Sequence, residues 1–489
     1  MSEFVVIVLV HLSGWALLRA LGLRDWGAVP LGFIAGVFGV IVLTFAFVVA
    51  GVDTTPSSVL TALALVGGVA LVLQRRVLDA AAYLTVAATS VGLVGAVVVL
   101  REAHVVSYHI DSFRYLMSAT LLASNTFGEF ATANLLTKRM LVTPAMHSLA
   151  HAYGEHYVRS LTPLLAIACL GALTYVLVTY HSRAATRRPV AIAWLAGVLA
   201  AALLLSINRY VFHAVYINAH LTVGAALLMT AAGGLLLVGQ RLTRHERPAV
   251  TVLVALSLAV TIVGRPEGFL FAGIALLPIV LAREVTLRER ALLTIVYGAS
   301  MLGWHGYVWL TLGSRATLES IGPAVLGALV LLAAPLHTLP GLTTARRVLL
   351  TVVFLALTVT FSGFSVLRFD PLQRSLVATY QNVVAGAGGW GLSLVMLAAL
   401  AVVAGTVALR REPSADVVWY PLASSPLLFF LLVFLREGAF RVGDGDSLNR
   451  MLIQVVPLAV LLVGIGIGAT RTPGLADAAE GSFKGEADA

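Results

Sequence analysis

The chain has 489 residues, of which 59% are apolar and 11% charged, and its formal net charge is +9. A soluble protein carries about 25% charged residues, so this composition excludes an ordinary soluble domain. The single cysteine, Cys169, excludes an internal disulfide and a thiolate metal site.

Apolar runs of about 15 to 24 residues recur along the chain, and each can cross or nearly cross a ~30 Å hydrocarbon core. They predict an all-α, polytopic transmembrane bundle of about 13 to 15 spans. The first run follows Ser2 and Glu3 rather than a basic segment, so we interpret it as a retained span and not as a signal peptide. The expected spans are 4–18, 28–51, 58–74, 80–100, 161–180, 189–206, 219–238, 249–263, 267–282, 291–312, 322–338, 347–367, 390–408, 417–435 and 451–470.

Basic residues gather in alternate connections between these spans. They are Arg19 and Arg24; Arg75 and Arg76; Arg183, Arg187 and Arg188; Arg241, Arg244 and Arg247; Arg283, Arg288 and Arg290; Arg346 and Arg347; Arg410 and Arg411; and Arg471. By the positive-inside rule these connections face the cytoplasm, which places the N-terminus outside and the C-terminus inside. The same rule explains the positive net charge without nucleic acid as a partner.

The long outer connection 101–160 begins with polar residues directly after a span. Asp111 can cap a helix with an apolar face, and 146–159 is also expected to be helical, so we predict two amphipathic helices on the outer leaflet. Asp111 is either such a cap or a general base, and the neighbouring Tyr108 and His109 favour the base.

The spacing of His147, His151 and Glu155 on one helical face is compatible with zinc. A solvent-facing side of an amphipathic helix explains the same spacing, and the chain lacks a full zinc signature. We therefore predict no metal.

The turn Gly264-Arg-Pro-Glu-Gly268 joins two apolar legs, each about 23 Å long as a helix and therefore shorter than a ~30 Å core. The turn should lie below the outer headgroups. Charges at that depth are costly and are functional candidates, so Arg265 and Glu267 either bind a ligand such as a lipid phosphate or form a structural ion pair.

Two further outer connections are rich in polar residues. The connection 207–218 and the start of the next span carry Arg209, Tyr216, Asn218 and His220, which suit either interface anchors or a groove for sugar hydroxyls. A Gly/Asp-rich loop brings Arg441, Asn449 and Arg450 to the mouth of the last span, which contains Pro457. Its Asp-Gly-Asp is a weak calcium signal, because no distal glutamate follows.

These motifs, in this order, resemble the GT-C superfamily of membrane glycosyltransferases. The resemblance rests on Tyr-His-Ile-Asp111 after an outward span, Lys138-Arg139 followed by Pro144, Arg265-Pro-Glu-Gly268, and Arg450 with Pro457. It implies a sugar donor on polyprenyl phosphate or pyrophosphate, with Asp111 as the base. Arg265, Arg450, Arg209 and Arg441 would bind the lipid phosphate, and the cavity would be lined by Tyr108, His109, Glu267, Tyr216, Asn218, His220 and Asn449.

Many members of the family have paired acids where this chain has Asp111 and Ser112. The serine favours a metal-independent reaction, no cofactor and a monophosphate donor, whose leaving phosphate needs only cationic stabilisation. We therefore expect an inverting glycosyltransferase of the bacterial plasma membrane. It would act on the outer face, and its partners would be the lipid-linked donor, a glycan or glycolipid acceptor and membrane lipids. An O-antigen-type polymerase or ligase, and a transporter or flippase of lipid-linked sugars, are the alternatives.

Three parts follow from this interpretation. Residues 1–79 form additional N-terminal spans, and 80–471 form the GT-C-like catalytic module. The Gly-, Ala- and acid-rich tail 472–489 is expected to be disordered in the cytoplasm.

Overall fold

The computed structural model describes residues 2–74, 80–102, 110–184, 189–315, 318–338, 341–435, 439–443 and 446–469. Every regular element in these ranges is a helix, which confirms the all-α prediction. The predicted tail, Arg471 and the arginines at 75, 76, 187 and 188 lie outside the described residues.

The α-helices are α1 (Glu3–Ala20), α2 (Ala28–Ala50), α3 (Pro56–Gln74), α4 (Ala80–Glu102), α5 (Ile110–Ala123), α6 (Phe127–Phe130), α7 (Val142–Ser148), α8 (Leu161–Ser182), α9 (Val190–Ser206), α10 (Asn208–Val215), α11 (His220–Val238), α12 (Arg247–Gly264), α13 (Gly268–Val280), α14 (Leu287–Leu312), α15 (Leu318–Ala333), α16 (Gly341–Thr344), α17 (Arg346–Leu367), α18 (Phe369–Val383), α19 (Ser393–Arg411), α20 (Asp416–Leu435) and α21 (Ser447–Ala469). Short turns of other helix types are η1 (Leu135–Arg139), η2 (Leu149–Tyr153), η3 (Gly313–Arg315), η4 (Ala334–Thr338) and η5 (Pro413–Ala415).

Each expected span corresponds to one helix, but about ten of the described helices, not 13 to 15, are long and apolar enough to cross a membrane. The lower number has physical reasons. Apolar stretches 84–100, 268–280 and 321–336 are short, and α9 is followed, after a bend of 73°, by α10. The 26-residue α14 is not among the ten; it opens with Arg288, Glu289 and Arg290. The chain is a multi-pass helical membrane protein.

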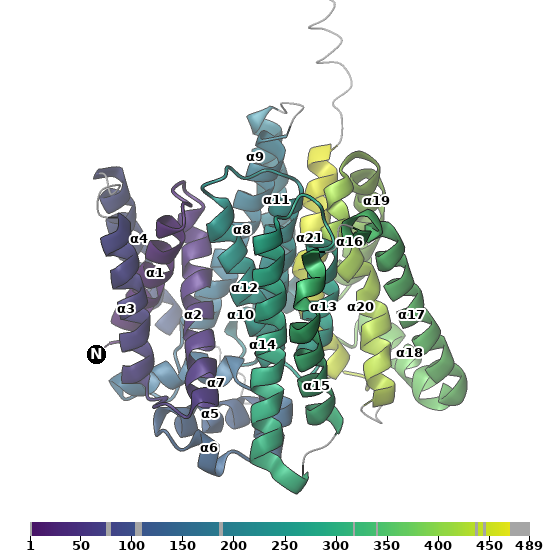
Figure 1. Cartoon of the computed structure of the whole chain (residues 1–489), viewed down its shortest axis with the longest axis horizontal. Helices are drawn as coiled ribbons and strands as arrows, with labels where there is room; N and C mark the ends of the chain where they lie inside the picture. The colour runs from purple at the N-terminus through teal and green to yellow at the C-terminus, as the bar shows by residue number, and fades with distance from the viewer. Residues whose placement is uncertain are drawn as a thin grey trace, which may run out of the picture.

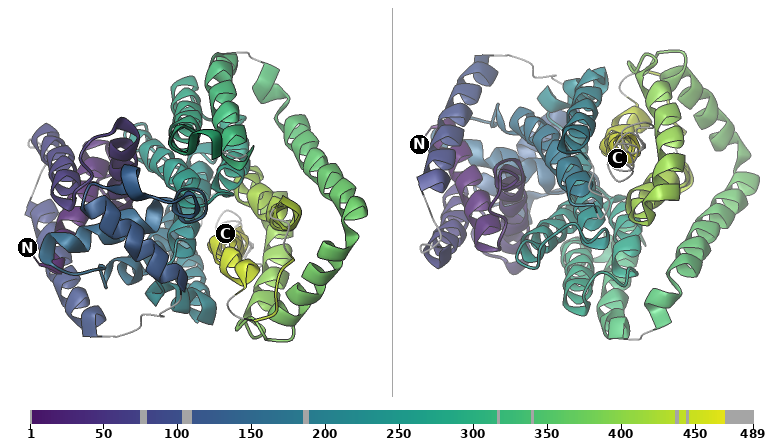
Figure 2. Two further views of the ribbon diagram at one scale, coloured as in Figure 1. Left: turned by 90° about the horizontal axis from the view of Figure 1, so that it is seen from below. Right: turned by 90° about the horizontal axis from the view of Figure 1, so that it is seen from above.

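The long helices stand side by side, and α5, α6 and α7 lie across one end of the bundle (Figure 1). Helix α11 is its centre, because every one of its residues is buried. Its small residues permit close packing: a Cβ on Gly224 would lie 2.9 Å from the carbonyl oxygen of Ile453 in α21. Helix α17 lies at the periphery, with 6% of its apolar window buried (Figure 2).

The first three helices pack together and against α8 and α12. Helices α1 and α2 approach closely, since a Cβ on Gly36 would lie 2.0 Å from the carbonyl oxygen of Val10. Glu3 also ties α1 to α8, because its carboxylate accepts hydrogen bonds from the backbone N–H (2.8 Å) and hydroxyl (2.7 Å) of Ser160.

Ion pairs join the basic connections at the end of the bundle opposite α5. Arg183 pairs with Glu246 at 2.6 Å, and the other pairs are Arg241–Glu412 (3.2 Å), Arg247–Glu289 (2.7 Å) and Arg346–Asp416 (2.8 Å). We call this the arginine end. Since these pairs link connections far apart in the sequence, the connections that carry Arg183, Arg241, Arg247 and Arg346 lie at the same end of the bundle. The opposite end is called the Asp111 end.

The connection between α4 and α8 differs in part from its prediction. Helix α5 forms where it was expected; Phe113, on the face expected to be apolar, is 73% exposed, and Tyr115 is 1% exposed. The second helix is earlier and shorter than 146–159, because α7 and η2 end at Gly154, which adopts a left-handed conformation (φ +80°). All residues of α7 are buried, so it does not lie flat on a surface. Glu155 falls beyond this end, and the helical face predicted for His147, His151 and Glu155 does not form.

Candidate functional site

The carboxylate of Asp111 is held between two arginines at the Asp111 end. Its Oδ1 lies 2.6 Å from Nη2 of Arg139, and its Oδ2 lies 2.5 Å from Nη1 of Arg450. The residue is 5% exposed. Asp111 sits in the first turn of α5, where the helix dipole favours a negative charge. Three segments that are distant in the sequence therefore meet at one carboxylate.

Arg139 is placed by an unusual backbone. It ends the π-helical turn η1, and Met140 follows with φ 51° and ψ −152°, a conformation that is uncommon outside glycine. Met140 is 1% exposed, and the N–H of Leu141 donates to the carbonyl oxygen of Val263 at the end of α12 (3.1 Å). Packing and this bond hold the strained turn, and the turn brings Arg139 to Asp111.

Tyr115 connects Arg139 with Arg265. It lies one helical turn after Asp111, and its ring centroid is 5.8 Å from the guanidinium carbon of Arg139, within cation–π range. Arg265 lies close enough to the Tyr115 hydroxyl for the two side chains to interact. This role of Tyr115 was not predicted, because an aromatic residue on an apolar helix face normally belongs to the core.

Arg265 and Glu267 form the ion pair that the sequence left as one alternative, with Nε and Oε1 3.2 Å apart. They are 7% and 1% exposed, between α12 and α13. The turn requires Gly268, where a Cβ would lie 1.9 Å from the carbonyl oxygen of Thr261. The contact of Arg265 with Tyr115 joins this pair to the surroundings of Asp111.

Arg450 is positioned by the segment before α21. Asp446 caps the helix, because its Oδ2 accepts a hydrogen bond from the N–H of Leu448 (2.9 Å). Its Oδ1 accepts from the N–H of Arg441 (2.8 Å) and so ties the preceding segment to the start of the helix. Asn382 of α18 binds the same segment, donating to the carbonyl oxygen of Arg441 (2.7 Å) and accepting from the N–H of Gly443 (2.8 Å). The side chain of Arg441 itself belongs to an exposed residue, and no contact places it with Asp111.

Asn449 and Arg209 are buried in a neighbouring network. Asn449 is 0% exposed; its Oδ1 accepts from the indole N–H of Trp390 (3.0 Å), and its Nδ2 donates to the carbonyl oxygen of Gly443 (2.7 Å). Arg209 donates from Nε to the carbonyl oxygen of Gly388 (2.5 Å). His213 lies close enough to Arg209 and Arg450 to be influenced by both charges. Arg209 thus borders the surroundings of Asp111.

The turn before α11 contains three more predicted residues. The amide of Asn218 donates to the carbonyl oxygen of Tyr216 (3.0 Å) and accepts from the N–H of His220 (2.7 Å), so it closes the turn. Nδ1 of His220 lies 3.0 Å from Nε2 of Gln454. Tyr216 is near Asp111 and the charge of Arg450, and burial raises the pKa of its hydroxyl, which keeps it protonated. Predicted residues Tyr108 and His109 lie outside the described residues.

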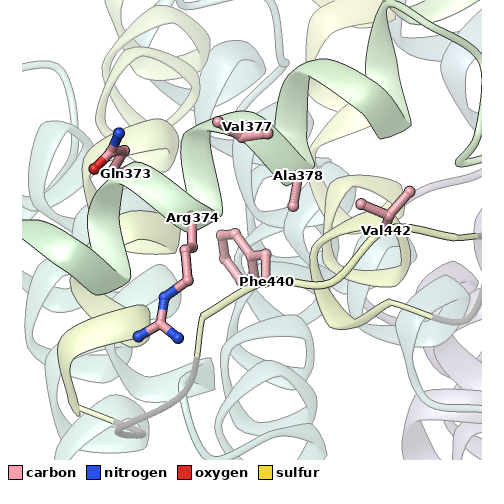
Figure 3. A pocket seen from close by; sticks show the side chains of 6 residues that line it. All are labelled: Gln373, Arg374, Val377, Ala378, Phe440 and Val442. Atoms are coloured by element: carbon pink, nitrogen blue, oxygen red, sulfur yellow. The ribbon is translucent and has the colours of Figure 1, made fainter.

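A separate pocket of about 370 Å³ lies between α18 and the segment 440–442 (Figure 3). Arg374 and Phe440 lie at its walls, with Gln373, Val377, Ala378 and Val442. Neither Arg139 nor Arg450 lines it.

We call the residues that meet around the carboxylate the Asp111 cluster: Asp111, Tyr115, Arg139, Tyr216, Arg265, Glu267 and Arg450. It contains three guanidiniums and two carboxylates, an excess of one positive charge, and Arg209 borders it. Within the described residues of the cluster this partly buried cationic excess is left over, and it favours an anionic ligand. Sequence analysis named five of the seven; Arg139 was only part of a motif, and Tyr115 was not considered.

Comparison with known proteins adds no further assignment: no protein-family model, no curated protein and no solved structure matches the chain.

Proposed function

We propose that the protein is a membrane glycosyltransferase of the GT-C type that moves a sugar from a polyprenyl-phosphate donor to a hydroxyl of a cell-envelope glycan or glycolipid. The observation that carries this proposal is the buried carboxylate of Asp111 at 2.6 Å from Arg139 and 2.5 Å from Arg450. This arrangement places a potential base beside cations that suit a phosphate.

In the proposed reaction Asp111 accepts the proton of the acceptor hydroxyl, and the hydroxyl oxygen attacks the anomeric carbon of the sugar. The bond between that carbon and the phosphate oxygen breaks, and its electron pair leaves with the polyprenyl phosphate. The phosphodiester carries one negative charge and the released monoester up to two, so guanidiniums stabilise the products and the transition state more than the donor. Attack in line with the leaving group inverts the anomeric carbon.

Ser112 stands where a second acid would favour a metal, and its hydroxyl donates to the backbone carbonyl of Ile217 (3.1 Å). The proposal therefore includes no metal and no cofactor. The positive-inside rule assigns the arginine end to the cytoplasm of a bacterial plasma membrane. The Asp111 cluster then faces outward, where lipid-linked donors and envelope acceptors share one leaflet.

The test is transfer by membranes that contain the protein, supplied with polyprenyl phosphate carrying a radiolabelled pentose or hexose and with an envelope glycolipid extract. We expect labelled acceptor and released polyprenyl phosphate in equal amounts. Asp111→Asn keeps the size of the side chain but loses the base, and transfer should fall at least ~100-fold. Asp370→Asn, an exposed carboxylate on α18, is the matched control and should retain wild-type activity.

Asparagine leaves two half-buried guanidiniums without their carboxylate, so each variant must also elute as a folded monodisperse protein. If folded Asp111→Asn retains more than about a tenth of the activity, another group is the base. If the lipid-linked sugar crosses the bilayer without cleavage, the protein is a transporter and the proposal is wrong.

A further inference from the structure

We infer that Arg139 is an additional ligand of the donor phosphate, and that the carboxylate of Asp111 occupies the position on Arg139 and Arg450 that the phosphate takes when it binds. This inference rests on the proposed function and adds an order of events to it.

The geometry of the carboxylate matches that of a phosphate. Each oxygen of Asp111 accepts from one guanidinium, at 2.6 Å from Arg139 and 2.5 Å from Arg450. Two non-bridging oxygens of a phosphodiester can make the same two charge-assisted bonds, and arginine is the side chain best suited to them. The carboxylate is thus an internal mimic of the proposed ligand.

Both guanidiniums also retain bonding capacity. The Nε atoms of Arg139 and Arg450 are buried, and neither has a hydrogen-bond partner among the described residues. A buried N–H donor without a partner is unfavourable, because it has lost its hydrogen bonds to water. A phosphate offers more acceptor positions than a carboxylate and can satisfy such donors together with the Nη atoms that now contact Asp111.

Replacement of the Asp111 carboxylate by the phosphate on the two arginines has a consequence for catalysis. While both oxygens of Asp111 accept from guanidiniums, the carboxylate is poorly placed to receive a proton from a hydroxyl. When the phosphate attracts Arg139 and Arg450, the oxygens of Asp111 are released beside the sugar that the phosphate carries. Donor binding therefore prepares the base, and the donor binds before the acceptor is activated.

The test measures the affinity of the purified, detergent-solubilised full chain for a polyprenyl monophosphate without sugar. Asp111→Asn should bind it about tenfold more tightly than the wild type, because the competing internal anion is removed. Arg139→Gln should bind about tenfold more weakly, and Arg139→Lys should recover part of that loss. Arg183→Gln, at the arginine end, is the matched control and should bind like the wild type.

If folded Asp111→Asn binds as the wild type does or more weakly, the carboxylate is not a competitor and the inference is wrong. If Asp111→Asn does not fold, Arg139→Gln decides, since unchanged affinity in that variant excludes Arg139 as a ligand. Absence of binding by the wild type is a different result: it contradicts the proposed function itself.

Discussion

Tyr115 shows how a single residue can organise the Asp111 cluster. Its ring lies 5.8 Å from the guanidinium carbon of Arg139, and its hydroxyl lies close to Arg265. The ring and the hydroxyl of Tyr115 thus contact different arginines, and substitutions can remove the two contacts separately. Phenylalanine removes the contact of the hydroxyl with Arg265 and keeps the ring beside Arg139, whereas leucine removes both contacts.

We predict that Tyr115→Phe lowers kcat/KM for transfer about tenfold, because the polar contact of the hydroxyl with the charged side chain of Arg265 is lost. Arg265→Ala should cost more, about 2 to 4 kcal/mol of transition-state stabilisation. If the hydroxyl acts through Arg265, the double variant should be no slower than Arg265→Ala. Tyr380→Phe, on the exposed side of α18, provides the control. Additive losses in the double variant would show that Tyr115 acts independently of Arg265.

At the scale of elements, the apolar pattern of the sequence predicted where the helices form, but it did not predict the side-chain contacts around Asp111. Uninterrupted apolar runs determine where helices form, so each expected span has its helix. The contact between Arg139 and Asp111 depends instead on a π-helical turn and on the positive φ of Met140, which no hydrophobic pattern encodes. Arg450 reaches Asp111 across 339 positions, and only the packed bundle brings them together. A buried tyrosine with a polar function is likewise hidden within a regular apolar face.

The crossing of α1 and α2 gives a prediction at this scale. A Cβ on Gly36 would lie 2.0 Å from the carbonyl oxygen of Val10, so Gly36→Ala must separate the two helices. We expect a lower melting temperature in detergent, by several degrees. Gly68→Ala is the control: this glycine of α3 has open space around its Cβ position, and alanine favours a helix there. Equal melting temperatures of the two variants would contradict the close crossing.

The whole molecule has two chemically different ends, which implies a definite orientation in the membrane. Arg244 is exposed at the arginine end, and Ser314 is exposed beyond the far end of α14. The positive-inside rule assigns these positions to opposite sides of the membrane.

Single cysteines introduced into a Cys169→Ala background test this orientation. We predict that Ser314→Cys reacts with an impermeant thiol reagent in intact cells, and that Arg244→Cys reacts only after the cells are opened. Reaction of Arg244→Cys in intact cells would place the Asp111 cluster in the cytoplasm and contradict an outward-facing transferase.

The exposed position of helix α17 would make its tilt depend on the thickness of the bilayer. Its 22 residues span about 33 Å, and it is held near its two ends, by Arg346 with Asp416 (2.8 Å) and by Arg368 with the carbonyl oxygen of Phe434 (3.3 Å). Its middle is largely exposed, so acyl chains surround it in a membrane. A thinner bilayer would tilt such a helix to relieve hydrophobic mismatch. The tilt would carry α18 with it, and Asn382 of α18 binds the segment that positions Arg450. Through α18, the thickness of the bilayer would then influence the position of the arginine that contacts Asp111.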